Sequence, residues 1–365
     1  MIFEILNNLK YRRIKNRYDK TLQNLPQIKL TSKEKNSIVQ LFKPLNIPVN
    51  PNWGGYYKYY LSYYEPLCIT PDVWKYMEMS LNPKKYRIIQ NKGILHKFID
   101  KRYLPVTIIN KINGIVFDQD DNILTKEEAI IILSRYEAFV YKPTVGTGGG
   151  KGVELVELKN LDREFKRERC EKLINGSQNF ICQEVLQCST KISKYNRYES
   201  TVNSIRCFTL NLNGKVSVIS SYLRMSYSNT VKDNVGASVS HKAGNIEGGG
   251  AFVGVRQNGT LSAFGLNRNY EKIFESPSGI ILKGERLEFY DKICETATAI
   301  HSKLPMLGFI AFDMTIDINE NVRVIEINLD SQDIEDHHIF NGAVFKERMP
   351  ELITYVKNNK PEFYR

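Results

Sequence analysis

The sequence lacks long apolar runs, closely paired cysteines and the signature motifs of protein kinases, and each absence excludes a class of protein. Its six cysteines are scattered without any Cys-x-x-Cys spacing, so neither a zinc site nor a disulfide framework is indicated. No stretch approaches the about 20 apolar residues of a membrane span. The N-terminal sequence also lacks the order of basic, apolar and small residues that forms a signal peptide. We therefore expect a cytoplasmic protein without a transmembrane segment.

The chain is basic, with a formal net charge of +11 over 365 residues, which favours anionic partners. Lysine and arginine are spread along the chain, and the one basic block is 10–20, so a dedicated nucleic-acid binder is not indicated. Segment 10–15 is compatible with a peripheral contact to an anionic membrane surface, but a solvated helix face is the favoured interpretation.

Segment 141–157, YKPTVGTGGGKGVELVE, places five glycines and a lysine between two short apolar runs. Without a Cβ, glycine lets backbone amides approach a ligand closely, so the loop is a candidate phosphate cradle. The Walker A pattern fails, because Val145 stands where its first glycine belongs and Gly152 follows Lys151 in place of a hydroxyl. The dinucleotide fingerprint fails as well, because Lys151 stands where its last glycine belongs. The candidate residues of this loop are Gly146, Gly148, Gly149, Gly150, Lys151 and Gly152.

The flanks of the loop, 138–141 and 153–156, are short β-branched or aromatic runs, which predicts a strand, a glycine loop and a second strand. Protein kinases and ATP-grasp enzymes both cover a nucleotide with such a hairpin. The chain contains no H-R-D or D-F-G motif, which disfavours a protein kinase. From the loop alone, a mobile surface hairpin without a ligand remains the alternative.

Segment 308–330, GFIAFDMTIDINENVRVIEINLD, predicts two strands around a turn at 319–321. Side chains alternate along a strand, so Glu326 and Asn328 share a face. Asp313 lies opposite Glu326 if the loop is 319–320, and opposite Asn328 if it is 320–321. Two carboxylates and an amide among apolar neighbours, without a cationic partner nearby in the sequence, predict a divalent cation such as Mg²⁺. The alternative is a solvent-facing acidic strand.

The element pattern predicts an α+β protein in three parts. The first, 1–90, is mainly helical and tyrosine-rich; the second, 91–190, is a small lobe with the glycine-rich lid; the third, 191–365, is a large lobe with the metal site. The tyrosine-rich stretch 48–66 reads as turn-rich, and it is either a substrate platform or aromatic packing between subdomains. Helices are expected over the first 25 residues, from 31, and at 71–81, 126–135, 161–175 and 287–304, with hairpins at 202–226, 246–264 and 308–328.

A lysine-bearing strand before a glycine-rich hairpin, a QEVLQ strand and a late Asp…Glu-x-Asn pair together resemble an ATP-grasp enzyme. More narrowly, NKGILHKFIDKRYLP, VNSIRCFT and NIEGGGAFVGVRQNGTL resemble the sugar-transfer associated ATP-grasp family. The resemblance runs from about residue 65 to residue 340. It implies an ATP-grasp fold, in which two α+β lobes clasp ATP.

The resemblance also implies roles for single residues. Lys92 and Lys142 would hold the α- and β-phosphates, and the glycine loop would close over the β- and γ-phosphates. Arg206 and Arg224 would face the γ-phosphate and the transferred group. The adenine contacts would come from Gln183, Glu184, Val185 and Leu186, and the Mg²⁺ ligands would be Asp313, Glu326 and Asn328.

The function implied is ligation, with ATP and Mg²⁺ as cofactors: an acyl phosphate forms on a carboxylate, and an amine then displaces phosphate to give an amide. By family association, the small-molecule substrates are a sugar or an amino acid used in surface-polysaccharide biosynthesis. The alternative is a sugar or sugar-phosphate kinase, with Asp330, Asp333 or His241 as general base. The acidic and imidazole-rich segment 330–338 either recognises a cationic amine or begins a helix at Asp330 or Ser331. The sequence does not predict an oligomeric state.

Overall fold

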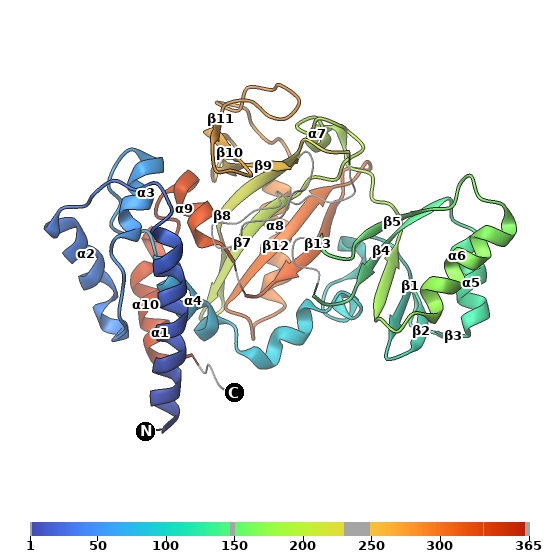
Figure 1. The fold of residues 1–365 in the computed structure, drawn as a ribbon, viewed down its shortest axis with the longest axis horizontal. Coiled ribbons are helices and arrows are strands. Elements are labelled where there is room, and N and C mark those ends of the chain that lie inside the picture. The colour runs from blue at the N-terminus through green and yellow to red at the C-terminus, as the bar shows by residue number, and fades with distance from the viewer. Residues whose placement is uncertain (1, 147–149, 230–248, 331, 362–365) are drawn as a thin grey trace.

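The computed structural model describes residues 2–146, 150–229, 249–330 and 332–361 (Figure 1). In Figure 1 a group of N-terminal and C-terminal helices lies on the left, a seven-stranded sheet in the middle and a six-stranded sheet on the right. Both sheets are antiparallel throughout their paired strands, and helices pack on their faces. The predicted α+β class is confirmed.

The N-terminal region consists of helices α1 (Ile2–Leu22), α2 (Ser32–Phe42), α3 (Trp53–Leu61) and α4 (Pro71–Leu81), with short 3₁₀ helices η1 (Lys43–Leu45), η2 (Lys84–Gln90), η3 (Leu95–Lys97) and η4 (Lys101–Tyr103). Thr31 caps the start of α2, where a helix was expected from residue 31. Its Oγ1 accepts from the amide of Glu34 at 3.2 Å, and the Glu34 carboxylate accepts from the amide of Thr31 at 2.7 Å. In the described part of the chain, no helix combines the length and apolarity needed to cross a membrane.

The tyrosine-rich stretch forms helix α3, so the expectation of a turn-rich segment is wrong. Trp53, Tyr56 and Tyr57 are completely buried. The Tyr57 hydroxyl donates to the carbonyl of Ile69 at 2.8 Å, and its ring meets the ring of His338 edge-on at 5.3 Å. Of the two interpretations offered by the sequence, these contacts fit aromatic packing between subdomains.

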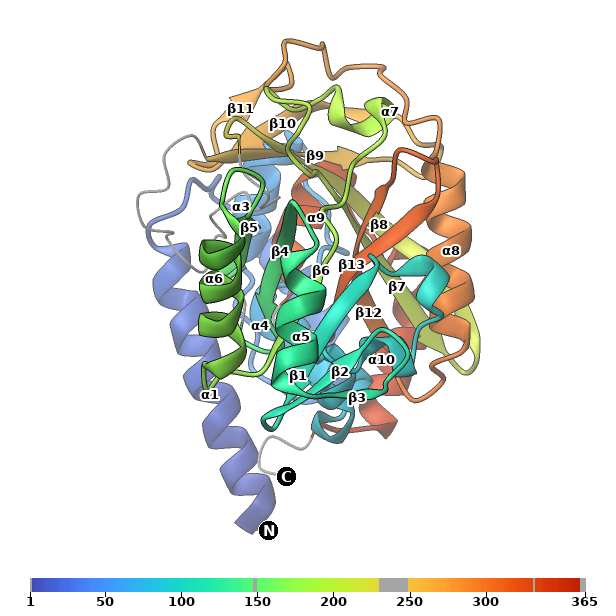
Figure 2. The same cartoon turned by 90° about the vertical axis from the view of Figure 1, so that its right-hand side faces the viewer.

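The small lobe is a six-stranded sheet in the order β3-β2-β1-β6-β4-β5. Helices α5 (Lys126–Ser134) and α6 (Arg163–Asn175) cover one face, in front of the sheet in Figure 2. Their buried residues share one apolar core with the strands, including Leu133, Ile174, Phe139 and Phe180. The strands are β1 (Thr107–Ile112), β2 (Ile115–Asp118), β3 (Ile123–Leu124), β4 (Ala138–Pro143), β5 (Glu154–Glu157) and β6 (Phe180–Gln183).

The large lobe is a seven-stranded sheet in the order β11-β10-β9-β8-β7-β12-β13, preceded by the short helix α7 (Thr190–Ser193). It contains the three predicted hairpins. Its strands are β7 (Ile205–Leu212), β8 (Lys215–Ser226), β9 (Gly250–Val255), β10 (Leu261–Asn267), β11 (Lys272–Ile273), β12 (Phe309–Ile316) and β13 (Val322–Asn328).

Each face of this sheet has its own core, because successive side chains on a strand point to opposite faces. Cys207 packs in the core that includes helix α8 (Tyr290–Ser302), whereas its neighbour Phe208 packs in the core that includes α4 and α10 (Met349–Asn358). Helix α9 (Ile334–Asn341) lies on the second face, where the His337 ring stacks on the Phe208 ring at 3.5 Å. The N-terminal region therefore packs on the same sheet face as Phe208.

We predict that Trp74→Ala lowers the free energy of unfolding by about 3–5 kcal/mol, because it leaves a large cavity at this contact. Trp74 is 2% exposed, and its ring packs on Phe309 of β12 at 4.8 Å and on Phe345 at 5.3 Å. Urea denaturation measures the change. The control is Phe165→Ala on α6, where the side chain is 59% exposed and the expected change is under about 0.5 kcal/mol. Equal losses in both variants would contradict the prediction.

Candidate active site

The hairpin of β12 and β13 brings Asp313 opposite Glu326, by a route that the sequence did not predict. Its loop has three residues, 318–320, and Glu320 adopts a left-handed conformation with φ 61°. From this loop Met314 pairs with Val324, and a bulge then shifts the register by one residue. Ile325 is the extra residue, so Asp313 pairs with Glu326 and Ala311 with Asn328. Of the two predicted pairings, the one with Glu326 is confirmed.

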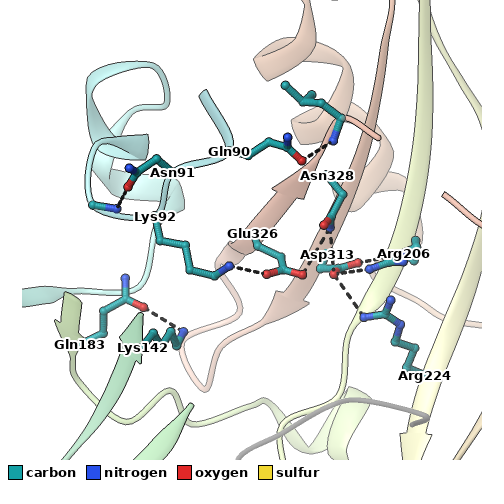
Figure 3. A network of polar contacts seen from close by, with 12 residues as sticks. Gln90, Asn91, Lys92, Lys142, Gln183, Arg206, Arg224, Asp313, Glu326 and Asn328 are labelled. Carbon is teal, nitrogen blue, oxygen red and sulfur yellow. Dashed lines mark hydrogen bonds and ion pairs between the residues drawn. The ribbon is translucent and has the colours of Figure 1, made fainter. Parts of the chain in front are cut away.

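The sheet order places two arginines beside Asp313. Directly paired residues on neighbouring strands share a face, and Asp313 pairs with Arg206 of β7, which in turn pairs with Tyr222 of β8. Arg206 donates from Nε to Asp313 Oδ1 and from Nη2 to Oδ2, both at 2.7 Å (Figure 3). Arg224 Nη1 donates to Oδ2 at 3.2 Å. The carboxylate is thus held by one bidentate and one single guanidinium contact.

These contacts decide the ionisation of Asp313, which is 1% exposed. Burial alone would raise the pKa of this carboxyl, but the charges of Arg206 and Arg224 and the hydrogen bond from Arg206 outweigh burial and hold it well below its usual value. Burial acts against the charge of Arg206 too, and Asp313 nevertheless raises the pKa of this guanidinium well above its usual value. Both partners therefore carry full charge in the interior.

The expectation that the acidic hairpin lacks cationic partners is wrong. Besides the two arginines on Asp313, Lys92 Nζ donates to Glu326 Oε2 at 2.8 Å. The prediction considered only the neighbours of the carboxylates along the chain, whereas these cations come from segments more than 80 residues away in sequence. Arg206 and Arg224 contact Asp313 here, and their role toward a γ-phosphate stays a prediction.

A cleft of about 320 Å³, measured with its open mouth, lies between the two lobes. Two of the predicted nucleotide residues, Lys92 and Gln183, line it together with mostly apolar side chains. Lys142 reaches the same place, because its Nζ donates to Gln183 Oε1 at 2.9 Å (Figure 3). The other lining residues were not predicted as site residues, although four of them lie in the motif NKGILHKFIDKRYLP. They are Leu95, His96, Leu104, Pro105, Thr107, Ile181, Val324 and Ile325.

The chain leaves the cleft directly after β6. The amide of Glu184 donates to the carbonyl of Val106 at 3.0 Å, which joins this segment to the start of β1. The side chains of Glu184 and Val185 are exposed and that of Leu186 is half-buried. Their predicted contacts with adenine stay a prediction.

The glycine loop connects β4 and β5, as predicted. Gly146, Gly150 and Gly152 have φ angles of 72°, 71° and 75°, which disfavour any residue with a Cβ. A Cβ on Gly152 would also approach Pro143 Cγ to 2.9 Å. Lys151 is exposed. The predicted contacts of Gly148 and Gly149 lie outside the described residues.

The charged side chains around the cleft give the site a net positive charge. Four cations, Lys92, Lys142, Arg206 and Arg224, gather around two carboxylates, Asp313 and Glu326, which leaves a net charge of +2 (Figure 3). A nucleoside triphosphate with its magnesium ion carries a net charge of about −2. The charge of the site is therefore opposite in sign and equal in magnitude to that of the magnesium complex of a triphosphate.

The donor set fits a hard divalent cation. Asn328 Nδ2 makes only long contacts, 3.3 Å to Asp313 Oδ2 and 3.4 Å to Glu326 Oε1. Rotating this amide by half a turn would gather its oxygen with oxygens of both carboxylates, and Mg²⁺ prefers such ligands. Elsewhere among the described residues, no group of three or more histidine, cysteine, aspartate or glutamate side chains is gathered for a metal ion.

The segment after Asn328 is partly structural. Asp330 pairs with Arg87 at 2.8 Å, and α9 begins at Ile334, a few residues later than predicted; Ser331 lies outside the described residues. His338 Nε2 accepts from the amide of Ile69 at 3.0 Å, and its Nδ1 donates to the carbonyl of Gly342 at 2.6 Å. Burial lowers its pKa to about 4, so this histidine stays neutral and ties the N-terminal region to α9. Of the other two candidate general bases, Asp333 is the residue that precedes α9, and His241 lies outside the described residues.

We predict that Asp313→Asn lowers the free energy of unfolding by about 3–5 kcal/mol at neutral pH, because it leaves Arg206 and Arg224 without a counter-charge in the interior. The depressed pKa of Asp313 sets the pH dependence of this loss. Its ionised carboxylate stabilises the fold above the usual pKa of an aspartate, and this contribution is lost as the pH falls toward the folded-state value. The difference between wild type and variant should therefore shrink in acid.

Urea denaturation at neutral and acidic pH measures both effects. The matched control is Asp120→Asn, where the side chain is 66% exposed and pairs only loosely with Lys101 at 3.5 Å, so the expected change is under about 0.5 kcal/mol. A loss for Asp313→Asn that stays constant with pH would contradict the electrostatic origin of the effect.

Comparison with known proteins identifies the family. The model of the family described as sugar-transfer associated ATP-grasp matches residues 74–353, and no curated protein matches the chain. Similar solved structures include the ATP-grasp ligase PsnB with its minimal precursor (14% identity, TM-score 0.40) and an L-amino acid ligase from Bacillus licheniformis (15% identity, TM-score 0.38). The alignments cover 76% and 74% of this chain, and the chain spans 63% of PsnB and 47% of the amino acid ligase. By the family match, which confirms the resemblance seen in the sequence, the chain belongs to the sugar-transfer associated ATP-grasp family.

Proposed function

We propose that the protein is an ATP-dependent carboxylate–amine ligase, which forms an amide through an acyl phosphate and releases ADP and phosphate. The observation that carries the proposal is the net +2 cluster around Asp313 and Glu326 at the cleft between the lobes. This charge suits a magnesium–triphosphate complex. Membership of an ATP-grasp family supports the same assignment.

The residues of the cluster have different roles, which follow from their positions. Lys92 and Lys142 neutralise phosphate oxygens beside the cleft, and Gln183 holds the Lys142 ammonium in place. Arg206 and Arg224 supply positive charge where the phosphoryl group is transferred. When bound, Mg²⁺ withdraws charge from the phosphate oxygens, and Asp313, Glu326 and Asn328 would hold it.

The chemistry needs positioning and charge neutralisation rather than a protein nucleophile. A carboxylate oxygen of the substrate attacks the γ-phosphorus, and the bond from phosphorus to the bridging oxygen breaks, so that ADP leaves. The amine nitrogen then attacks the acyl carbon, the bond from carbon to the phosphate oxygen breaks, and phosphate leaves as the nitrogen loses a proton. Bonds formed and broken balance in both steps.

A kinase on the same scaffold is the weaker proposal. It requires a general base near the acceptor hydroxyl. Asp330, one sequence candidate, is already paired with Arg87 at 2.8 Å, and His241, another, lies outside the described residues. A ligase needs no such base for its first step, because the attacking carboxylate is already ionised.

The family description supports substrates drawn from surface-polysaccharide chemistry: a sugar or amino acid that supplies the carboxylate, and a second small molecule that supplies the amine. A cytoplasmic location, where ATP is available, belongs to the same proposal.

We predict that Lys142→Met weakens the binding of magnesium–ATP roughly tenfold or more, because one charge-assisted contact is worth about 1.5–3 kcal/mol. Glu326→Gln should abolish turnover while leaving the unfolding transition close to that of the wild type. Calorimetry measures affinity, and release of ADP measures turnover. The control Lys159→Met removes a lysine whose side chain is 70% exposed, and it should bind like wild type. Wild-type affinity for magnesium–ATP in the Lys142 variant would contradict the proposal that this site binds a nucleotide.

The products distinguish a ligase from a kinase. With a substrate carboxylate, ATP and hydroxylamine, a ligase releases free phosphate and yields a hydroxamate, because hydroxylamine intercepts the acyl phosphate. A kinase instead yields a phosphorylated acceptor without free phosphate. The second outcome would overturn the ligase proposal and leave the nucleotide site intact.

A further inference from the structure

The backbone of Leu329, directly after the candidate metal ligand Asn328, is held on both sides by side chains from another part of the chain. Gln90 Oε1 accepts from the amide of Leu329 at 2.9 Å (Figure 3). Asn82 Nδ2 donates to the carbonyl of Leu329 at 2.8 Å. Both side chains belong to residues 82–92, here called the bridging segment, which connects α4 to Lys92.

Asn82 uses its amide completely. Its second Nδ2 hydrogen goes to the carbonyl of Phe309 at 2.7 Å, and its Oδ1 accepts from the amide of Phe309 at 3.2 Å. Phe309 begins β12 and Leu329 follows the end of β13, so one side chain, 2% exposed, ties the two strands of the metal hairpin together.

Strands β12 and β13 need these hydrogen bonds from Asn82, because the pairing between the two strands ends at this point. The last paired residues of the hairpin are Ala311 and Asn328, and β13 is the edge strand of the sheet. Beyond Asn328 the backbone has no ladder to continue, and the end of an edge strand frays unless other groups hold it. Gln90 and Asn82 take the place of the missing neighbour.

The other end of the bridging segment contacts the small lobe. The amide of Lys92 donates to the carbonyl of Thr144 at 3.0 Å, two residues after Lys142, and Lys92 Nζ binds Glu326. Arg87, within the segment, pairs with Asp330. A stretch of 11 residues therefore contacts both the hairpin of β12 and β13 and the residue directly after β4, the strand that carries Lys142.

We propose that Gln90 and Asn82 are positioning residues, which fix the backbone at Leu329 so that the Asn328 side chain stands correctly for the divalent cation. The inference rests on the proposed function, because it assigns a role toward the magnesium site. Some residues hold metal ligands in place without contacting the metal themselves. Mutation of such residues typically lowers metal affinity by about 10–100-fold. The N-terminal part of the chain thereby supports the catalytic centre directly.

Gln90 is the better residue to test, because two side chains of similar size can replace it. One of them keeps the hydrogen bond to the Leu329 amide and the other removes it. Gln90→Met removes the acceptor for the Leu329 amide, and Gln90→Glu keeps it. Gln40→Met, on the exposed face of α2, is the matched control. The readouts are the Mg²⁺ affinity of the ATP-bound protein by calorimetry, the affinity for ATP in EDTA and the thermal unfolding midpoint.

We expect Gln90→Met to weaken Mg²⁺ binding about tenfold or more, with ATP affinity in EDTA changed less than about twofold. Gln90→Glu and Gln40→Met should bind Mg²⁺ like wild type. Unchanged Mg²⁺ affinity in Gln90→Met would overturn the inference. So would a fall in the unfolding midpoint together with an equal loss of metal-free ATP binding, because that pattern means a merely structural role. A wild type that does not bind magnesium–ATP would instead overturn the proposed function itself.

Discussion

The ion pair between Asp313 and Arg206, reinforced by Arg224, is the constraint on which the seven-stranded sheet depends. Two or more charges in an interior cost several kcal/mol each unless they meet in good geometry. The three side chains come from β12, β7 and β8, so their charges are balanced only when these strands lie next to one another in this order. The candidate active site therefore depends on this strand order, because a sheet with a different order would leave a buried charge without a partner.

Much of this architecture follows from local patterns in the sequence, and for local reasons. The glycine loop and its flanking strands depend on nearby residues, as do the alternating hairpin of β12 and β13 and the capped start of α2 at Thr31. The cationic partners of the acidic hairpin did not follow, because Arg206 is 107 residues from Asp313. The helix α3 did not follow either. Two glycines and a preceding proline favour a turn locally, but burial of Trp53 and Tyr56 against the rest of the protein outweighs that preference.

The N-terminal region extends the candidate active site rather than standing apart from it. Trp74 packs on β12, the neutral His338 joins Ile69 to α9, and Asn82 joins the two ends of the metal hairpin. These three contacts lie on one face of the large sheet, with the arginines of the site. The opposite face is covered by α8 and carries an apolar core. The candidate site therefore shares its face of the sheet with one apolar core, and the opposite face carries another.

The bulge at Ile325 determines on which face of the sheet the side chains of Glu326 and Asn328 lie. In a regular ladder that kept every residue, Asp313 would pair with Ile325, and both Glu326 and Asn328 would point into the core beneath α8. The bulge lies between the loop at 318–320 and the candidate metal ligands Glu326 and Asn328. A change in the length of the loop at 318–320 would leave this arrangement intact, and so would deletion of Ile325, because Glu326 would then follow Val324 directly and pair with Asp313 in a regular ladder.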